Sequence, residues 1–173
     1  MTPARLRLAM IVGASLLVIC WFLWWSSNGV QADRTFARLK SAIENGSAGG
    51  VLDNLHRSYD IKASWPNQLG SEGGDIADAI GTSAVRLIVL RGLTGLFQLQ
   101  SADPFVFHYT IAQVEARNDS TVAVTVSINL STTSGNRPLT FTPSLTNQRF
   151  ILAKDGWWPA LYVKSHPAFS VAY

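Results

Sequence analysis

The sequence predicts an α+β protein in which an N-terminal transmembrane helix precedes a curved antiparallel sheet, packed on a long helix with two shorter helices. Three observations lead to this fold class. Residues 8–25 form one uncharged apolar run. Apolar residues then recur at helical spacing in the first part of the remaining chain, and alternate with polar residues in its second part. Helices followed by strands are typical of α+β folds with helices on one face of a sheet.

The apolar run at residues 8–25 predicts a membrane anchor. Arg5 and Arg7 precede it, and no other charge occurs before Asp33. Its length lies near the lower end of the roughly 17 to 25 residues that cross a bilayer as a helix. The three tryptophans near its end, Trp21, Trp24 and Trp25, suit the membrane–water boundary. We therefore expect residues 1–30 to form a cytoplasmic tip, a single-pass signal-anchor and a short joint, and residues 31–173 to form one folded domain.

Two alternatives to an uncleaved anchor stay open. Val30 and Ala32 place small residues where a signal peptidase needs them, although the apolar run exceeds the roughly 7 to 15 residues of the apolar region in a typical signal peptide. Cys20 could carry a lipid, although no small residue directly precedes it. The arginines before the run favour a cytoplasmic N-terminus, whereas Arg34, Arg38 and Lys40 soon after it reduce the charge asymmetry that sets the orientation. The expected location is the bacterial inner membrane, with the C-terminal domain in the periplasm.

Composition excludes several classes of function. Two of the fourteen Lys and Arg precede the apolar run. The others nearly balance the eleven Asp and Glu, so the rest of the chain has a net charge close to zero. A near-neutral domain has no electrostatic footprint for nucleic acid. The sole cysteine lies in the apolar run, which rules out a disulfide within the domain. No metal-ligand spacing and no phosphate-binding glycine motif occurs, so we expect neither a metal nor a cofactor.

Helical patterns come first in the domain. Phe36, Leu39 and Ile43 recur at spacings of three and four and predict an amphipathic helix over residues 31–44, which Asn45-Gly46 would end. Three shorter segments follow: a helix over 51–59, a strand over 61–65 and a glycine-rich loop over 67–74.

The next expected element is a long helix from about residue 75 to residue 99, buried against the sheet on most sides. Its apolar part could be mistaken for a second membrane span. Arg86 and Arg91 argue against that, because each charge near the centre of a span costs roughly 2.5 to 3.5 kcal/mol.

The second part of the domain reads as four strands, over 105–117, 121–131, 145–154 and 157–165. The strand over 121–131 has the clearest alternation, with aliphatic residues on one face. Asn118-Asp119 and Asp155-Gly156 fit the tight turns of two hairpins. A polar loop over 132–144 separates these hairpins, and the tail over 166–173 either packs or frays.

This order of elements resembles the nuclear transport factor two-like (cystatin-like, cone-shaped) superfamily over about residues 32–165. The carrying features are the first helix ending in Glu44-Asn45-Gly46, the helix over 84–99, and the segments 117–124 and 150–158, the latter with aromatics after an Asp-Gly turn. The resemblance implies a cone of sheet around a long helix, often with a pocket and often dimerising through the sheet. The superfamily includes dehydratases, isomerases, epoxide hydrolases, ligand binders and non-catalytic scaffolds. The layout is also similar to that of membrane-anchored bacterial members in envelope assemblies, such as type IV secretion scaffolds and proteins of lipid-import systems.

Candidate catalytic groups are few. His108 lies in mid-strand beside Tyr109, and the hydrolytic relatives imply a His or Asp that works with a Tyr as acid and base. Asp103 and Asp60, at strand ends, are candidate carboxylates. The sequence places no second polar group beside His108, so a structural role for it is the competing interpretation. Surface positions are expected for the other two histidines, His56 and His166.

Candidate interaction residues are Trp157 and Trp158. Neighbours on a strand face opposite sides, so one of them fills the core and the other either docks a partner or packs under the tail. The leading prediction is a single-pass, non-catalytic protein-interaction or scaffold module of a bacterial cell-envelope complex. Its expected partners are the membrane, through residues 8–25, other envelope proteins, and a second copy through the sheet. The alternative is a small-molecule binder or an acid–base enzyme of the dehydratase or isomerase type.

Overall fold

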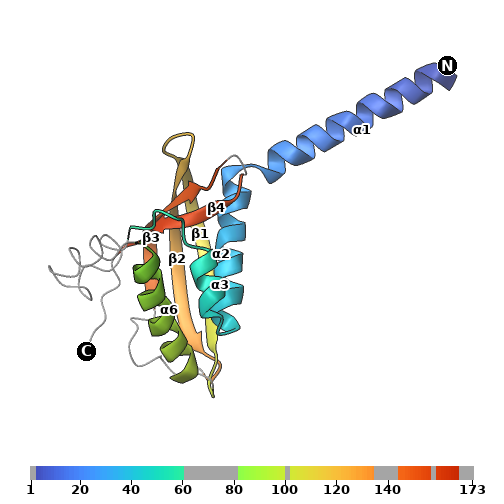
Figure 1. Cartoon of the computed structure of the whole chain (residues 1–173). Helices are drawn as coiled ribbons and strands as arrows, with labels where there is room; N and C mark the ends of the chain where they lie inside the picture. Colours follow the sequence, from blue (N-terminus) through green and yellow to red (C-terminus); the bar gives the residue numbers. More distant parts are fainter. Residues whose placement is uncertain (1–2, 61–81, 100–101, 135–143, 157–158, 168–173) are drawn as a thin grey trace.

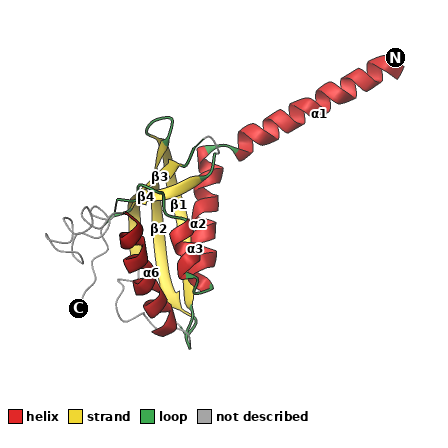
Figure 2. Ribbon diagram, viewed as in Figure 1, coloured by secondary structure: helices red, strands yellow, loops and turns green. Residues whose placement is uncertain are grey.

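The computed structural model describes residues 3–60, 82–99, 102–134, 144–156 and 159–167. Its helices are α1 (Pro3–Trp25), α2 (Asn28–Glu44), α3 (Ala48–Asp53) and α6 (Thr82–Leu99). Its strands are β1 (Phe105–Ala116), β2 (Thr121–Thr132), β3 (Ser144–Lys154) and β4 (Leu161–Ser165). Helix α1 projects from a domain in which α2, α3 and α6 lie on one side of the sheet (Figures 1 and 2). The predicted α+β class is confirmed.

The sheet is antiparallel and has the strand order β1-β2-β3-β4. As predicted, β1 pairs with β2 and β3 pairs with β4. Because Lys154 pairs with Leu161, the connection between β3 and β4 is longer than the tight turn predicted at Asp155-Gly156. Strand β4 begins at Leu161 rather than at residue 157, and Trp157 and Trp158 lie outside the described residues. Leu55, after α3, forms a parallel bridge with Val163 of β4. The loop predicted over 132–144 is described only at its first residues and at Ser144, where β3 begins.

The core lies between α2 and the inner face of the sheet. Val122, Val124 and Val126 are at most 1 % exposed, which confirms the aliphatic face predicted for this strand. Phe36 of α2 is fully buried, and its ring packs edge-on against Phe150 of β3 at a centroid distance of 5.3 Å. Aromatic contacts of this geometry add to the stabilisation that apolar burial supplies.

Helix α2 ends as predicted and begins earlier. It starts at Asn28 rather than at residue 31, so that only Ser26 and Ser27 separate it from α1. Its end at Glu44 agrees with the prediction, and Gly46 adopts the left-handed conformation (φ 62°) that glycine tolerates best.

Helix α3 corrects the prediction of a helix over 51–59. It spans Ala48–Asp53, because the Ser47 hydroxyl oxygen accepts a hydrogen bond from the Gly50 N–H and caps the helix start. The backbone then turns away to pair Leu55 with β4. The strand predicted over 61–65, the loop over 67–74 and the start of the long helix at 75–81 lie outside the described residues.

Helix α6 confirms the predicted helix over its described part and corrects the expected burial. None of its described side chains is buried, and Leu87 is 47 % exposed. Its contacts run chiefly to α3, whereas α2 packs along β1 and the core. The apolar composition of α6 therefore does not make it the central helix. That position belongs to the more amphipathic α2.

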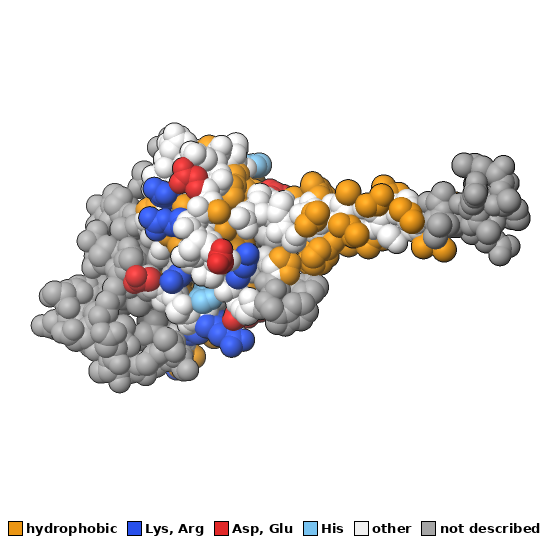
Figure 3. Space-filling model, turned by 90° about the horizontal axis from the view of Figure 1, so that it is seen from above, with side chains coloured by type: hydrophobic (Ala, Val, Ile, Leu, Met, Phe, Trp, Pro, Cys, Tyr) orange, Lys and Arg blue, Asp and Glu red, His pale blue; other side chains and the backbone are white. Residues whose placement is uncertain are grey.

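From Met10 onward, the large apolar side chains of helix α1 are exposed. Figure 3 shows such side chains along the face of the helix that it presents. Within the described residues, no helix taken alone meets the length and hydropathy expected of a membrane span. Two successive helical segments together have the length and composition of a span, Met10–Trp25 and Asn28–Glu44. Their axes are bent by 58° relative to each other.

Candidate functional site

The described surface contains a cleft of about 560 Å³ between the ends of α2 and α6, here named the α2–α6 cleft. Its lining residues are Ile43, Glu44, Asn45, Gly46, Ala48, Gly49, Leu90, Thr94, Phe97, Gln98, Pro104 and Phe105. The volume falls within the roughly 300 to 1,000 Å³ of small-molecule sites. The rings of Phe97 and Phe105 meet edge-on at a centroid distance of 6.1 Å, which gives the cleft an aromatic wall.

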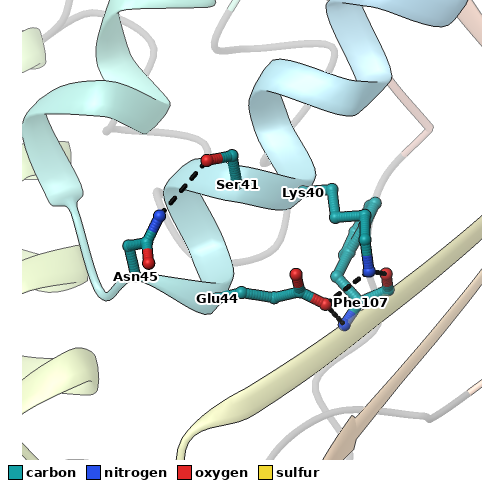
Figure 4. Close-up of polar contacts among 5 residues, drawn as sticks. All are labelled: Lys40, Ser41, Glu44, Asn45 and Phe107. Carbon is teal, nitrogen blue, oxygen red and sulfur yellow. Dashed lines mark hydrogen bonds and ion pairs between the residues drawn. The ribbon is translucent and has the colours of Figure 1, made fainter.

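Glu44 is the ionisable residue in the wall of this cleft. Its Oε1 accepts a hydrogen bond from Lys40 Nζ at 2.5 Å and another from the Phe107 backbone N–H at 3.0 Å (Figure 4). Lys40 Nζ also donates to the Phe107 carbonyl oxygen at 2.9 Å. Side chains one turn apart on α2 thus hold the outer edge of β1.

The environment of Glu44 favours its charged form. Burial acts to raise the pKa of its carboxyl group, but the hydrogen bonds from Lys40 and the Phe107 N–H, and the positive charges of Lys40 and His108, together lower it. Glu44 therefore stays ionised at neutral pH. An ionised carboxylate can accept hydrogen bonds from a ligand but cannot donate a proton to one.

The structure does not bring the predicted catalytic candidates together. His108 is exposed and lies on the opposite side of β1 from Phe107 and Tyr109, the side that the helices do not cover. The alternation of β1 explains this correction, because Phe105 and Phe107 occupy the buried positions of the strand.

Tyr109 and Asp103 have separate local partners. The Tyr109 hydroxyl donates to Asp33 Oδ1 at 3.0 Å. Burial first, and then this bond to Asp33, raise the pKa of Tyr109 to about 12. Asp103 accepts hydrogen bonds from both hydroxyl and backbone groups of Ser134 and from the Thr133 hydroxyl at 2.8 Å, which lower the pKa of its carboxyl group. Asp103 thereby ties the start of β1 to the end of β2.

The structure reveals a second pair of polar side chains that the sequence did not indicate. His166, expected at the surface, is buried, and its Nε2 accepts a hydrogen bond from the Tyr59 hydroxyl at 2.6 Å. Its Nδ1 lies 2.8 Å from the Pro167 carbonyl oxygen, which assigns the proton of the neutral ring to Nδ1. Burial lowers the pKa of His166 to about 4, although the Pro167 contact acts to raise it. The other histidine expected at the surface, His56, is half-buried, with Nδ1 2.9 Å from the Ser58 hydroxyl.

The lining of the α2–α6 cleft suits the binding of a small molecule. Within the described residues, no group of three His, Cys, Asp or Glu could hold a metal ion. The α2–α6 cleft combines apolar walls with amide, hydroxyl and carboxylate groups. Such a lining fixes the orientation of a bound molecule by hydrogen bonds and gains affinity by burying its apolar part.

Comparisons with known proteins place the fold. Neither a family model nor a curated protein matches the sequence. Among solved structures, Aln2 from a Streptomyces species is similar with a TM-score of 0.53 and 12 % identity, over 82 % of this chain and 88 % of that one. A Catenulispora acidiphila protein, solved in complex with S-DNPA, is similar with a TM-score of 0.52 and 17 % identity, over 80 % of this chain and 90 % of that one. A conserved protein from Planctomyces limnophilus is similar with a TM-score of 0.50 and 8 % identity, over 84 % of this chain and 98 % of that one. At these identities the likeness shows the fold alone, an α+β arrangement of helices on an antiparallel sheet.

Proposed function

We propose that this protein is a membrane-anchored, non-catalytic binding module of the bacterial cell envelope. Helix α1 crosses the inner membrane once and holds the cone-shaped domain on the periplasmic side, where it docks other envelope proteins. The exposure of α1 is the observation that carries the proposal. Apolar side chains on every side of this helix stay 50 to 73 % exposed, among them Ile11, Leu17, Val18 and Leu23.

If this helix were in water, the protein would expose an unusually large apolar surface. Exposed apolar patches on monomeric proteins are normally limited to a few hundred Å². A bilayer removes that surface from water without requiring any complementary protein groove. The direction of α1, away from the domain, leaves the whole helix available to lipid (Figure 1).

The non-catalytic part of the proposal has separate support. The inner face of the sheet is filled by aliphatic and aromatic side chains, and the candidates His108, Tyr109 and Asp103 do not converge. Acid–base catalysis requires positioned groups within hydrogen-bond reach of one reacting centre. A filled cone favours a module that acts by binding over a dehydratase or an isomerase.

The anchor is tested by fractionation of cells that express the full-length chain. Leu17→Arg combined with Val18→Arg places two charges in mid-helix, each costing roughly 2.5 to 3.5 kcal/mol in a span, and should release the protein from alkali-washed membranes. Leu87→Arg is the matched control, since this exposed leucine lies on α6, and its variant should stay with the membrane. Equal retention of both variants would contradict the anchor.

The docking role is tested by crosslinking native membranes and purifying the tagged full-length protein. The expected result is an envelope protein recovered in stoichiometric amount, and its loss on replacement of Trp157 or Trp158 by Ala would identify the contact. Recovery of the protein alone, or only as a dimer through the sheet, would overturn the scaffold role.

A second candidate function is small-molecule binding, which the α2–α6 cleft favours. Its volume of about 560 Å³ and its mixed lining suit a small aromatic molecule with a polar end. The similar Catenulispora acidiphila structure contains S-DNPA, so one protein of this fold holds a small molecule. In this alternative the anchor keeps the binder beside the membrane.

A further inference from the structure

We infer that Arg34 binds the phosphate group of a membrane lipid and thereby fixes the domain at a set angle to the bilayer. This inference rests on the proposed function, because it requires α1 to lie in the membrane. It goes beyond anchoring by assigning a specific lipid contact to a residue of the domain.

The depth of the Arg34 side chain follows from its contact with Trp25. The guanidinium carbon lies 4.8 Å from the centre of the Trp25 ring, a cation–π contact. Trp25 is the last residue of α1, and its ring stacks on Trp21 at a centroid distance of 6.2 Å. Tryptophan rings at the end of a span settle at the level of the lipid headgroups. A guanidinium held against such a ring therefore lies at the depth of the lipid phosphates.

The donors of Arg34 are available to a ligand. Among the residues that the structure describes, none forms an ion pair or a hydrogen bond with the Arg34 guanidinium. The neighbouring acid, Asp33, instead accepts from the Tyr109 hydroxyl. Arg38, one turn further along α2, donates internally to Asn54 Oδ1 and to the Leu161 carbonyl oxygen. Arg34 is thus the arginine at this joint that keeps its planar fork of N–H donors for an anion.

Phosphate is the anion that this position selects. A guanidinium matches a phosphate with two parallel hydrogen bonds, and such charge-assisted pairs are stronger than neutral ones. At the headgroup level, lipid phosphates are the anions present at high local concentration. A free phosphate or an acidic protein segment would have to enter the same layer to reach the ring-bound guanidinium.

The joint between α1 and α2 transmits this contact to the domain. Gln31, which is 3 % exposed, donates from Nε2 to the Trp25 carbonyl oxygen at 2.6 Å. Backbone bonds from Ser26 to the Phe22 carbonyl and from Ser27 to the Trp24 carbonyl close the bend. The two helix axes meet at 58° across this short connection. Because these hydrogen bonds span the bend, a lipid held by Arg34 restrains the orientation of the domain as well as that of the side chain.

Solid-state NMR tests the contact directly. The full-length protein carries carbon-13 at Cζ of every arginine, in vesicles of phosphatidylcholine and phosphatidylglycerol. Arg5→Lys and Arg7→Lys form the common background, because these residues precede the span and would face phosphates of the other leaflet. Dephasing of the Cζ signal by phosphorus-31 reports arginines beside lipid phosphate. We expect this dephasing to be lost in Arg34→Lys, which keeps the charge, and to be retained in Arg91→Lys, since Arg91 is exposed on α6.

The native cysteine separates failure of the inference from failure of the anchor. Cys20 is exposed within the apolar run of α1, and an inserted helix protects it from a water-soluble maleimide. Protection of Cys20 together with Arg34-dependent dephasing supports the lipid contact. If Cys20 is protected but the dephasing is the same in Arg34→Lys as in the background protein, the lipid contact is overturned and the anchor is retained. Modification of Cys20 in intact vesicles overturns both the anchor and the contact that depends on it.

Discussion

Glu44 and Phe107 are joined by a hydrogen bond of 3.0 Å in which the carboxylate of the helix residue accepts from the backbone N–H of the strand residue. Phe107 belongs to β1, an edge strand of the sheet that the described residues form, and Lys40 binds its carbonyl oxygen. The two side chains therefore occupy the place of a neighbouring strand. Unpaired edge groups are a route to aggregation, so this clamp also protects the edge of the sheet.

The clamp predicts a measurable loss of stability. Glu44→Ala leaves the Phe107 N–H without its acceptor and removes one of the two acceptors of the Lys40 ammonium, so it should lower the free energy of unfolding by about 1 to 2 kcal/mol. Because the pKa of Glu44 is lowered on folding, its contribution is present above its ordinary pKa and is lost as the pH falls through the lowered value. Urea denaturation of the full chain in detergent measures both effects.

The control for the clamp is Glu115→Ala. Glu115 pairs with Arg149 at 2.8 Å, but both side chains are about half exposed, so the loss should stay below about 1 kcal/mol. A loss for Glu44→Ala no larger than that of the control would show that α2 does not hold the strand edge through this contact.

Buried His166 predicts a decline of stability in acid. Its pKa falls from 6.5 to about 4 on folding, so the unfolded chain binds a proton more readily between these values. Stability from this group is therefore complete above pH 6.5 and is lost progressively towards pH 4, by up to roughly 3 kcal/mol. Thermal unfolding across this range should show a smaller slope for His166→Gln than for the native chain.

The matched control here is His56→Gln. This histidine is half-buried and contacts the Ser58 hydroxyl, and its replacement should leave the decline between pH 6.5 and pH 4 in place. An unchanged slope in His166→Gln would exclude His166 as the source of the acid sensitivity.

The sequence predicted best what depends on neighbouring residues. The alternation of residues 121–131 located β2 and its buried face, because a strand with one covered side needs period-two hydrophobicity. Asp155-Gly156 marked the β3–β4 hairpin, since the positive φ of Gly156 is unfavourable for other residues. Likewise, Asn45-Gly46 marked the end of α2.

Features that depend on distant residues could not be predicted. The burial of His166 requires Tyr59, and the local pattern around Pro167 resembles an exposed tail. Helix α6 is as apolar as a central helix, yet its place in the fold is set by contacts with α3. The role of Glu44 was missed because its partner is a backbone group on a strand far along the chain. The hydrophobic periodicity of a sequence carries no information about contacts between distant residues.

The aromatic centre of the core predicts the largest loss of stability. Phe36 is fully buried and contacts the rings of both Phe150 and Tyr109, at 5.3 and 5.6 Å between centroids. Phe36→Ala should cost about 3 to 5 kcal/mol, because the cavity cannot collapse between α2 and the sheet. Leu87→Ala, at an exposed position of α6, should change stability by less than about 0.5 kcal/mol. Similar denaturation midpoints for both variants would contradict the placement of the core.

The α2–α6 cleft predicts that ligand binding can be blocked without unfolding the domain. Gly49 lines the cleft, and a Cβ built on it meets no atom within 4 Å, so Gly49→Trp should fill the space. Fluorine NMR with the full chain in nanodiscs measures the binding of fluorinated aromatic fragments. They should bind the native protein, and their affinity for the Gly49→Trp variant should be at least about tenfold lower, equivalent to about 1.4 kcal/mol. Gly92→Trp is the control, because Gly92 also has open space but lies outside the cleft lining. Empty nanodiscs account for partition into lipid. Fragments that bind both variants as well as the native chain would place any small-molecule site elsewhere.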